Sequence, residues 1–257
     1  YCVLKVLGQG EVGITYVTWR QGSTMVLKTL TPRWADNPRA WAALECEAGM
    51  LQQIQHSQIP RFIDFFSIGD QPYLAMEFFP GQSLAQRLVT GQAVALEQAI
   101  AWVSNLCEVL HYLHGFVPPL LHRGIKPSSL IPQPLPDRPN AMALVDFGTI
   151  KAIVLGERAS SIGFAGYSAP EQLAVDATPA VDLYGLGALL AHLVTGQNPL
   201  AFYSDRGSGY RFYSDAVPGI SPELANLLHT LTHPNPEQRY RSAEAVRVAL
   251  QQLAISS

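Results

Sequence analysis

The sequence predicts an α+β chain in two parts, a strand-rich first third followed by a mainly helical remainder. Up to about Leu30, the apolar residues are rich in β-branched and aromatic types broken by glycines. After Pro80-Gly81, apolar residues recur at three- and four-residue spacing, which is typical of helices. Because Pro and Gly interrupt regular structure, we expect a first lobe over 1–79, a second over 80–257 and a hinge at about 77–82.

The first part is expected to form a sheet with one helix set against it. The Ala-, Leu-, Glu- and Gln-rich segment 38–55 predicts the helix. Turns are expected at Gln21-Gly22-Ser23 and Gly69-Asp70-Gln71-Pro72. The expected strands are 2–7, 14–19, a third ending near Lys28, 62–67 and 73–78.

The second part is expected to contain helices joined by loops. The Pro-rich segment 132–139 cannot lie inside a regular element, so it predicts an enlarged turn between two short strands. The stretch 183–204 lacks charge, but polar residues and Pro199 interrupt its second half, which favours a buried core helix over a membrane span. The expected helices are 83–88, 96–114, 180–194, 222–231 and 242–253.

Composition excludes several classes of protein. A net charge of −3, from 17 basic and 20 acidic residues, argues against nucleic-acid binding. Three widely spaced cysteines, Cys2, Cys46 and Cys107, indicate reduced thiols in the cytoplasm rather than a disulfide framework or zinc site. The first residues lack the basic, apolar and small-residue succession of a signal peptide. A chain that begins with Tyr1 is expected to be a domain of a longer protein, whose other parts could hold a membrane anchor.

Several motifs carry chemistry. Gly8-Gln9-Gly10-Glu11-Val12-Gly13 matches G-x-G-x-x-G, which alone could be an ordinary hairpin. The following Ile14-Thr15-Tyr16-Val17 favours a strand, whereas a dinucleotide-binding loop would open a helix. Lys28 ends an apolar strand, and Glu47 lies on the next helix; Glu45 is a rival on a different helix face.

The order of these motifs and of those that follow resembles the protein kinase superfamily, most of all its bacterial Ser/Thr kinase branch. The resemblance implies a bilobal kinase fold, with a small antiparallel N-lobe sheet plus one helix and a mainly helical C-lobe. The later motifs are His122 to Ser129, Asp146-Phe147-Gly148, Ala169-Pro170-Glu171, Asp182 with Tyr184-Gly185-Leu186-Gly187, and Pro236-Glu237-Gln238-Arg239.

The resemblance also implies ATP and Mg²⁺ as ligands. It implies that Lys28 pairs with Glu47 and contacts phosphates, that Lys126 contacts the γ-phosphate, and that Asp146 binds magnesium. Met76 would be the gatekeeper beside the adenine, and Arg239 would pair with Glu171. The implied nucleotide-binding residues are Gly8, Gly10, Gly13, Lys28, Glu47, Glu77, Phe79, Lys126 and Asp146, with the hinge contacts made by the Glu77 carbonyl and the Phe79 amide.

Three positions depart from the kinase pattern. Gly124 stands where the loop Asp should be the general base, and Ser129 stands where an Asn should bind the second magnesium, so Ser129 could hold the ion only through water. Phe164 replaces the usual Thr of the activation segment. Arg123 remains, with Ser160 and Ser161 as candidate phosphate acceptors or plain turn residues.

These departures predict a pseudokinase, a domain that binds ATP with magnesium, transfers phosphate poorly or not at all, and acts on a protein partner or substrate yet to be identified. Two alternatives stay open: a weakly active Ser/Thr kinase, and an interaction scaffold that binds no nucleotide. His111 and His114 could suggest a metal, but without a third ligand the polar end of a core helix is the better interpretation. Neither nucleic acid nor membrane contact is expected from this segment.

Overall fold

A computed structural model describes residues 1–147, 166–172, 177–207 and 209–256. The chain forms two compact units. The first comprises Tyr1–Pro80 together with Phe147, and the second comprises Gly81–Asp146 and the described residues from Gly166 onward. The boundary between the units lies between Pro80 and Gly81, and the hinge at about 77–82 stays a prediction.

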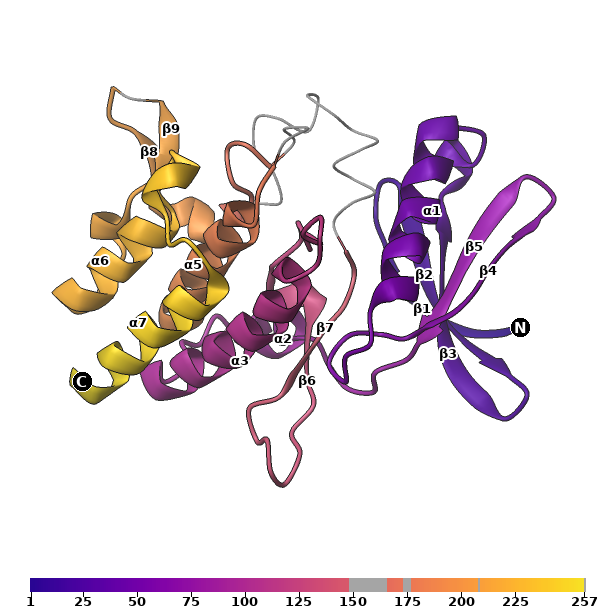
Figure 1. Ribbon diagram of the computed structural model, residues 1–257, viewed down its shortest axis with the longest axis horizontal. Coiled ribbons are helices and arrows are strands. Elements are labelled where there is room, and N and C mark those ends of the chain that lie inside the picture. Colours follow the sequence, from indigo (N-terminus) through magenta and orange to yellow (C-terminus); the bar gives the residue numbers. More distant parts are fainter. Residues whose placement is uncertain (148–165, 173–176, 208, 257) are drawn as a thin grey trace. The chain divides into compact units, whose positions relative to one another are not determined.

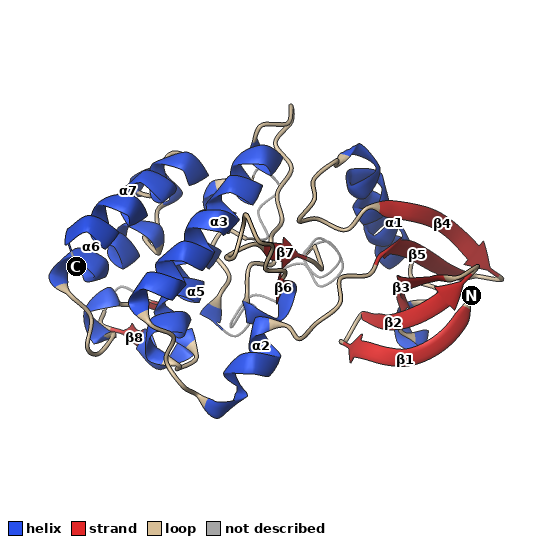
Figure 2. Cartoon of the chain, turned by 90° about the horizontal axis from the view of Figure 1, so that it is seen from below, coloured by secondary structure: helices blue, strands red, loops and turns tan. Residues whose placement is uncertain are grey.

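The first unit is built on an antiparallel sheet with the strand order β1-β2-β3-β5-β4 (Figure 2). Gln21 and Gly22, with φ of 50° and 85°, make the tight turn between β2 and β3, because a two-residue hairpin favours positive φ at both turn positions. The strands are β1 (Cys2–Gln9), β2 (Gly13–Arg20), β3 (Ser23–Leu30), β4 (Phe62–Ile68) and β5 (Gln71–Glu77).

One helix, α1 (Pro38–Gln53), packs against β3, β4 and β5 of this sheet (Figure 1). Its start is set by Asn37, whose side chain accepts hydrogen bonds from the Arg39 and Ala40 amides, and by Pro38 at the first position. Its buried residues recur at helical spacing, which places an apolar stripe against the sheet. They are Ala40, Ala43, Leu44, Glu47, Ala48 and Leu51.

The second unit is mainly helical, and its core lies around α5 (Ala180–Thr195), which is buried on nearly all sides. Helix α3 (Leu96–His114) packs against α5 and α7 (Ala243–Ser256), and α6 (Pro222–Leu231) packs against α5 (Figure 1). The short helices are α2 (Leu84–Arg87), η2 (Leu88–Thr90), η3 (Pro127–Ser129), η6 (Pro199–Phe202), η7 (Ser214–Ala216) and η8 (Pro236–Gln238). None of the described helices is long and apolar enough to cross a membrane.

Two short hairpins complete the second unit. The Pro-rich segment forms the turn between β6 (Leu130–Pro132) and β7 (Met142–Leu144), as predicted, except that Pro132 is the last residue of β6. The second hairpin, β8 (Tyr203–Asp205) paired with β9 (Tyr210–Phe212), was not predicted. The sequence pattern that could have predicted this hairpin is the alternation of aromatic and polar residues on both sides of Gly207 and Gly209. Both glycines have positive φ.

Several predicted boundaries were wrong by one to a few residues. β5 begins at Gln71, so the turn after β4 is only Gly69-Asp70, and Pro72 lies inside the strand. Pro72 is the second residue of the strand and lies beyond the last residue that pairs with β3, and its carbonyl accepts the Thr29 hydroxyl at 2.6 Å. β3 continues two residues beyond Lys28 to Leu30 because its last residues pair with the start of β2.

Candidate nucleotide-binding and catalytic site

Lys28 and Glu47 form a buried ion pair in the first unit. The Lys28 ammonium donates to both carboxylate oxygens of Glu47, at 2.8 and 2.9 Å, with side-chain exposures of 8% and 1%. Glu47 lies on the buried face of α1 with Leu44 and Leu51, whereas Glu45 is exposed. Of the two acidic residues considered from the sequence, only Glu47 contacts the lysine.

The glycine loop connects β1 to β2. The Gly10 amide donates to the Gly13 carbonyl at 2.8 Å, which closes a tight turn across the loop. At Gly13, a Cβ atom would lie 3.2 Å from the Thr29 carbonyl oxygen, so a side chain would press against β3. No atom lies within 4 Å of the position of a Cβ at Gly8.

The predicted hinge residues lie at the end of β5. Met76 is buried, and its strand pairs with β3 on one side and β4 on the other. The Glu77 carboxylate accepts from the Arg61 side chain at 3.1 Å, and the Glu77 amide donates to the Arg61 carbonyl at 2.9 Å. Phe79 follows the strand end and is half-buried.

In the second unit, Asp182 anchors the loop that carries His122 and Arg123. Its carboxylate accepts from the His122 amide at 2.9 Å and the Arg123 amide at 2.7 Å, and it lies 3.0 Å from the His114 Nε2. Burial would raise the pKa of Asp182, but the hydrogen bond and charge of His114, together with the His122 ring and amide, lower it. His114 therefore serves this anchor, and the described residues contain no group of three residues suited to hold a metal.

His122 is fully buried within the same loop. Its Nδ1 accepts from the Gly124 amide at 3.2 Å, so this nitrogen carries no proton in that hydrogen bond. Burial lowers the pKa of His122 to about 4, although the negative charges of Asp182 and Asp146 act to raise it. The imidazole is therefore neutral at pH 7 and shapes the loop rather than carrying charge.

Ser129 also has a structural role in this loop. Its hydroxyl lies 2.8 Å from both the Gly124 and Lys126 carbonyl oxygens and accepts from the Lys126 amide at 3.2 Å. The residue is completely buried. A serine hydroxyl has one proton and two lone pairs, so these contacts use most of its hydrogen-bonding capacity and leave little for a metal-bound water.

Two residues of this region hold strained backbone conformations. Arg123 has a φ of 57° and Asp146 a φ of 63°, values that cost a non-glycine residue of the order of 1 kcal/mol. The Val145 amide donates to the Ser129 carbonyl at 2.8 Å, which ties the residue before Asp146 to the loop. Gly148, Ser160, Ser161 and Phe164 lie outside the described residues.

Beside Gly124 lie polar groups that were not predicted from the sequence. They line a small depression with no room for a water molecule and belong to Arg123, Tyr167, Ser168 and Gln172, among others. In the part of the chain that the structure describes, the buried Ser168 hydroxyl and Gln172 side-chain oxygen make no hydrogen bond. Sequence alone could not identify them, because their burial depends on how residues 166–172 pack on α5.

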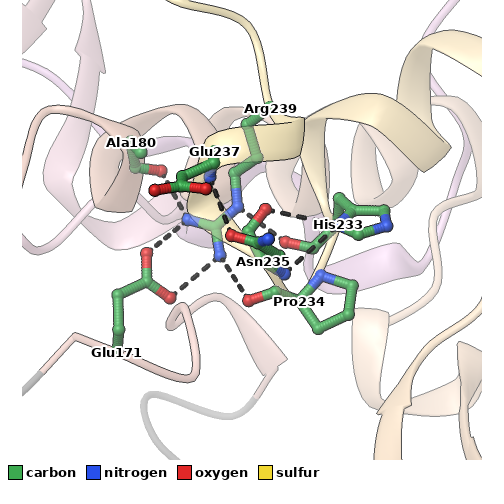
Figure 3. Close-up of polar contacts among 7 residues, drawn as sticks. All are labelled: Glu171, Ala180, His233, Pro234, Asn235, Glu237 and Arg239. Carbon is green, nitrogen blue, oxygen red and sulfur yellow. Dashed lines mark hydrogen bonds and ion pairs between the residues drawn. The ribbon is translucent and has the colours of Figure 1, made fainter.

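Arg239 fixes the segment that ends at Glu171. Two guanidinium nitrogens contact the two Glu171 oxygens at 2.5 and 2.9 Å, a bidentate ion pair (Figure 3). The same guanidinium donates to the Ala180 carbonyl at 2.8 Å and, through Nε, to the His233 carbonyl at 2.7 Å. The arginine thus joins its own segment to Glu171 and to the start of α5, which are 68 and 59 residues away in the sequence.

A five-stranded sheet with one helix and a buried Lys–Glu pair, followed by a helical unit with an Asp-anchored loop, is the architecture of a protein kinase. Residues 1–250 match the protein kinase domain model, and the chain belongs to that family.

Relatives and solved structures agree with this assignment. The chain is 31% identical to serine/threonine-protein kinase D of Synechocystis sp. and 30% identical to serine/threonine-protein kinase PknA of Nostoc sp., matching 100% and 98% of this chain. It spans 52% and 47% of those proteins, about half their length. The PknI kinase domain of Mycobacterium tuberculosis has the same fold, with a TM-score of 0.75 at 23% identity over 97% of this chain and 94% of the other.

Proposed function

We propose that this chain is a pseudokinase of the bacterial Ser/Thr type, which binds ATP with magnesium, transfers phosphate poorly or not at all, and acts as a nucleotide-responsive module for a partner protein. The observation that carries the proposal is the anchored loop around Gly124. Asp182 and His122 hold this loop through its backbone amides, yet Gly124 has no side chain that could accept a proton.

The absence of a general base should slow phosphoryl transfer without weakening nucleotide binding. A general base contributes roughly 10²- to 10⁴-fold to a rate, whereas nucleotide binding does not depend on it. The Ser129 hydroxyl is hydrogen-bonded to the carbonyls of Gly124 and Lys126 in its own loop. We therefore assign magnesium to Asp146 rather than to Ser129. The strained Asp146 backbone supports a ligand role, because such conformations cluster at functional sites.

Nucleotide binding is supported by the first unit. The ion pair with Glu47 holds the Lys28 ammonium in one position, and a fixed cation is what a triphosphate requires. By resemblance, the glycine loop, the Glu77 carbonyl, the Phe79 amide and Lys126 complete the ATP contacts. If ATP binds, magnesium would neutralise the phosphate charge, and Lys28 and Lys126 would orient the phosphates.

A reducing cytoplasmic setting belongs to the same proposal. The three cysteines are free thiols. Burial raises the pKa of Cys107, so that thiol stays protonated and unreactive.

The decisive experiment measures the melting temperature with and without ATP and magnesium, with Lys28→Ala as the control. Ligand at about 100 times its dissociation constant should stabilise the protein by roughly 2.7 kcal/mol. A magnesium-dependent increase that is lost in the variant supports nucleotide binding, and no increase at millimolar ATP favours a scaffold that binds no nucleotide. A phosphotransfer assay then separates a pseudokinase from a weak kinase, which would label a peptide or itself.

A further inference from the structure

Thr31 occupies an unusual position directly after β3. It precedes the short helix η1 (Pro32–Trp34) as its N-cap residue, where a threonine hydroxyl normally accepts a hydrogen bond from the first helical amides. The Thr31 hydroxyl makes no such bond. It donates instead to the Glu11 carbonyl at 3.0 Å, at the tip of the glycine loop.

A second hydrogen bond joins the same two segments. The Thr31 amide donates to the Val12 carbonyl at 2.8 Å, which extends the pairing of β2 with β3 beyond Gly13 and Leu30. Thr31 and Val12 are both buried, at 6% and 1% exposure. The two carbonyls at the loop tip are therefore held by one buried residue, although Glu11 itself is exposed.

This arrangement determines where the loop amides point. In a planar trans peptide the N–H and C=O groups point in opposite directions. Because the Glu11 and Val12 carbonyls face Thr31, the amides of Val12 and Gly13 face away from it. Two successive amides directed to one side can bind an anion such as a phosphate.

The strand that holds the loop also carries the phosphate-binding lysine. Lys28 and Thr31 lie at the same end of β3, so the loop amides and the ammonium are fixed to one rigid element. We infer that Thr31 is a positioning residue for nucleotide phosphates: its hydroxyl holds the glycine loop in register with Lys28. This inference rests on the proposed nucleotide binding.

The test compares Thr31→Val with Thr31→Ser. Valine matches threonine in shape and lacks the hydroxyl, and serine restores it. Calorimetric titration with Mg-ATP should give about five- to tenfold weaker binding for Thr31→Val, the factor that corresponds to one hydrogen bond. The affinity of Thr31→Val for adenosine, which has no phosphate, is measured by competition. It should change less than about twofold, because the loop acts on phosphates only.

Thr18→Val is the matched control. Thr18 is also buried and donates to a strand carbonyl, that of Met25 at 3.3 Å, at the end of β2 away from the loop. This variant should leave the ratio of ATP to adenosine affinity unchanged. Thr31→Ser should bind Mg-ATP within about twofold of the wild type.

Amide hydrogen exchange provides a readout without nucleotide. Thr31→Val should accelerate exchange in residues 9–13 and leave α1 unchanged, because the hydroxyl tethers only the loop. Equal losses for ATP and adenosine, or unchanged exchange in the loop, would overturn the inference while the proposed function stands. A wild type that binds no Mg-ATP would overturn both.

Discussion

At the residue scale, the proposed loss of phosphotransfer depends on single side chains. Gly124 lacks the side chain that a general base requires, although the backbone around it is held by Asp182 and His122. Gly124 is not among the described glycines with positive φ, so a residue with a side chain could adopt a similar φ.

Restoring the two lost side chains should raise phosphotransfer. We expect Gly124→Asp with Ser129→Asn to increase the rate by roughly 10²-fold or more, because a base is regained. The measurement is incorporation of labelled phosphate from Mg-ATP into a peptide. Gly124→Asn with Ser129→Asn is the control, since it has the same shape without the base. Equal rates for the two double variants would show that a base at residue 124 does not limit transfer.

The ion pair of Arg239 with Glu171 should matter far more to stability than a surface pair. Removing Glu171 leaves a guanidinium of 0% side-chain exposure without its counter-ion. We expect Glu171→Ala to lower the free energy of unfolding by about 3 kcal/mol, measured by urea denaturation. Asp215→Ala breaks the exposed ion pair with Arg206 and should change the free energy of unfolding little. Similar losses for both variants would contradict this ranking.

At the scale of elements, two helical glycines show how packing decides the effect of one substitution. On α1, no atom outside the helix lies within 4 Å of the position of a Cβ at Gly49. On α5, a Cβ at Gly187 would lie 2.7 Å from the Leu231 Cβ and 2.8 Å from the Thr232 Cγ2. The glycine of α5 is therefore required by its close approach to α6, and that of α1 is not.

The same Gly-to-Ala change should have opposite signs at these positions. We expect Gly49→Ala to stabilise the protein by about 0.5–1 kcal/mol, because alanine loses less backbone entropy in a helix. Gly187→Ala should destabilise it by about 1–3 kcal/mol through overpacking against α6. Urea denaturation of both variants tests this, and a gain in stability for Gly187→Ala would show that α6 moves without cost.

For the whole molecule, the buried His122 links stability to pH. Its pKa is about 4 in the folded chain against an ordinary value of 6.5, so the unfolded chain binds the proton more readily. The contribution of neutral His122 to the free energy of unfolding is complete above pH 6.5 and is lost as pH falls from 6.5 towards 4. The lowered pKa of Asp182 acts in the same direction at still lower pH.

We expect acidification from pH 7 to pH 4 to cost up to about 3 kcal/mol through His122 alone. The measurement is urea denaturation at several pH values. His122→Asn cannot titrate, so its stability should fall less steeply over the same interval. Parallel slopes for wild type and variant would assign the acid sensitivity to other groups.

Much of this organisation could be predicted from the sequence. Local signals predicted the elements: glycines in the turns, β-branched and aromatic residues in the strands, and apolar residues at helical spacing. The β8–β9 hairpin was missed because three-residue strands carry too little periodicity to stand out in a helical context. The boundaries of β3 and β5 depend on their partner strands, which local sequence does not specify.

The sequence by itself determined the fold class, the motif order and the absence of a carboxylate at residue 124, because these depend only on residue identity and spacing. Only the tertiary structure decided which side chains share hydrogen bonds. It joined Lys28 to Glu47 rather than leaving Glu45 as a candidate, and it turned the Ser129 hydroxyl into its own loop. It also brought Thr31 to the glycine loop. Hydrogen bonds require atoms within about 3 Å, and only the folded chain brings residues so far apart in sequence that close.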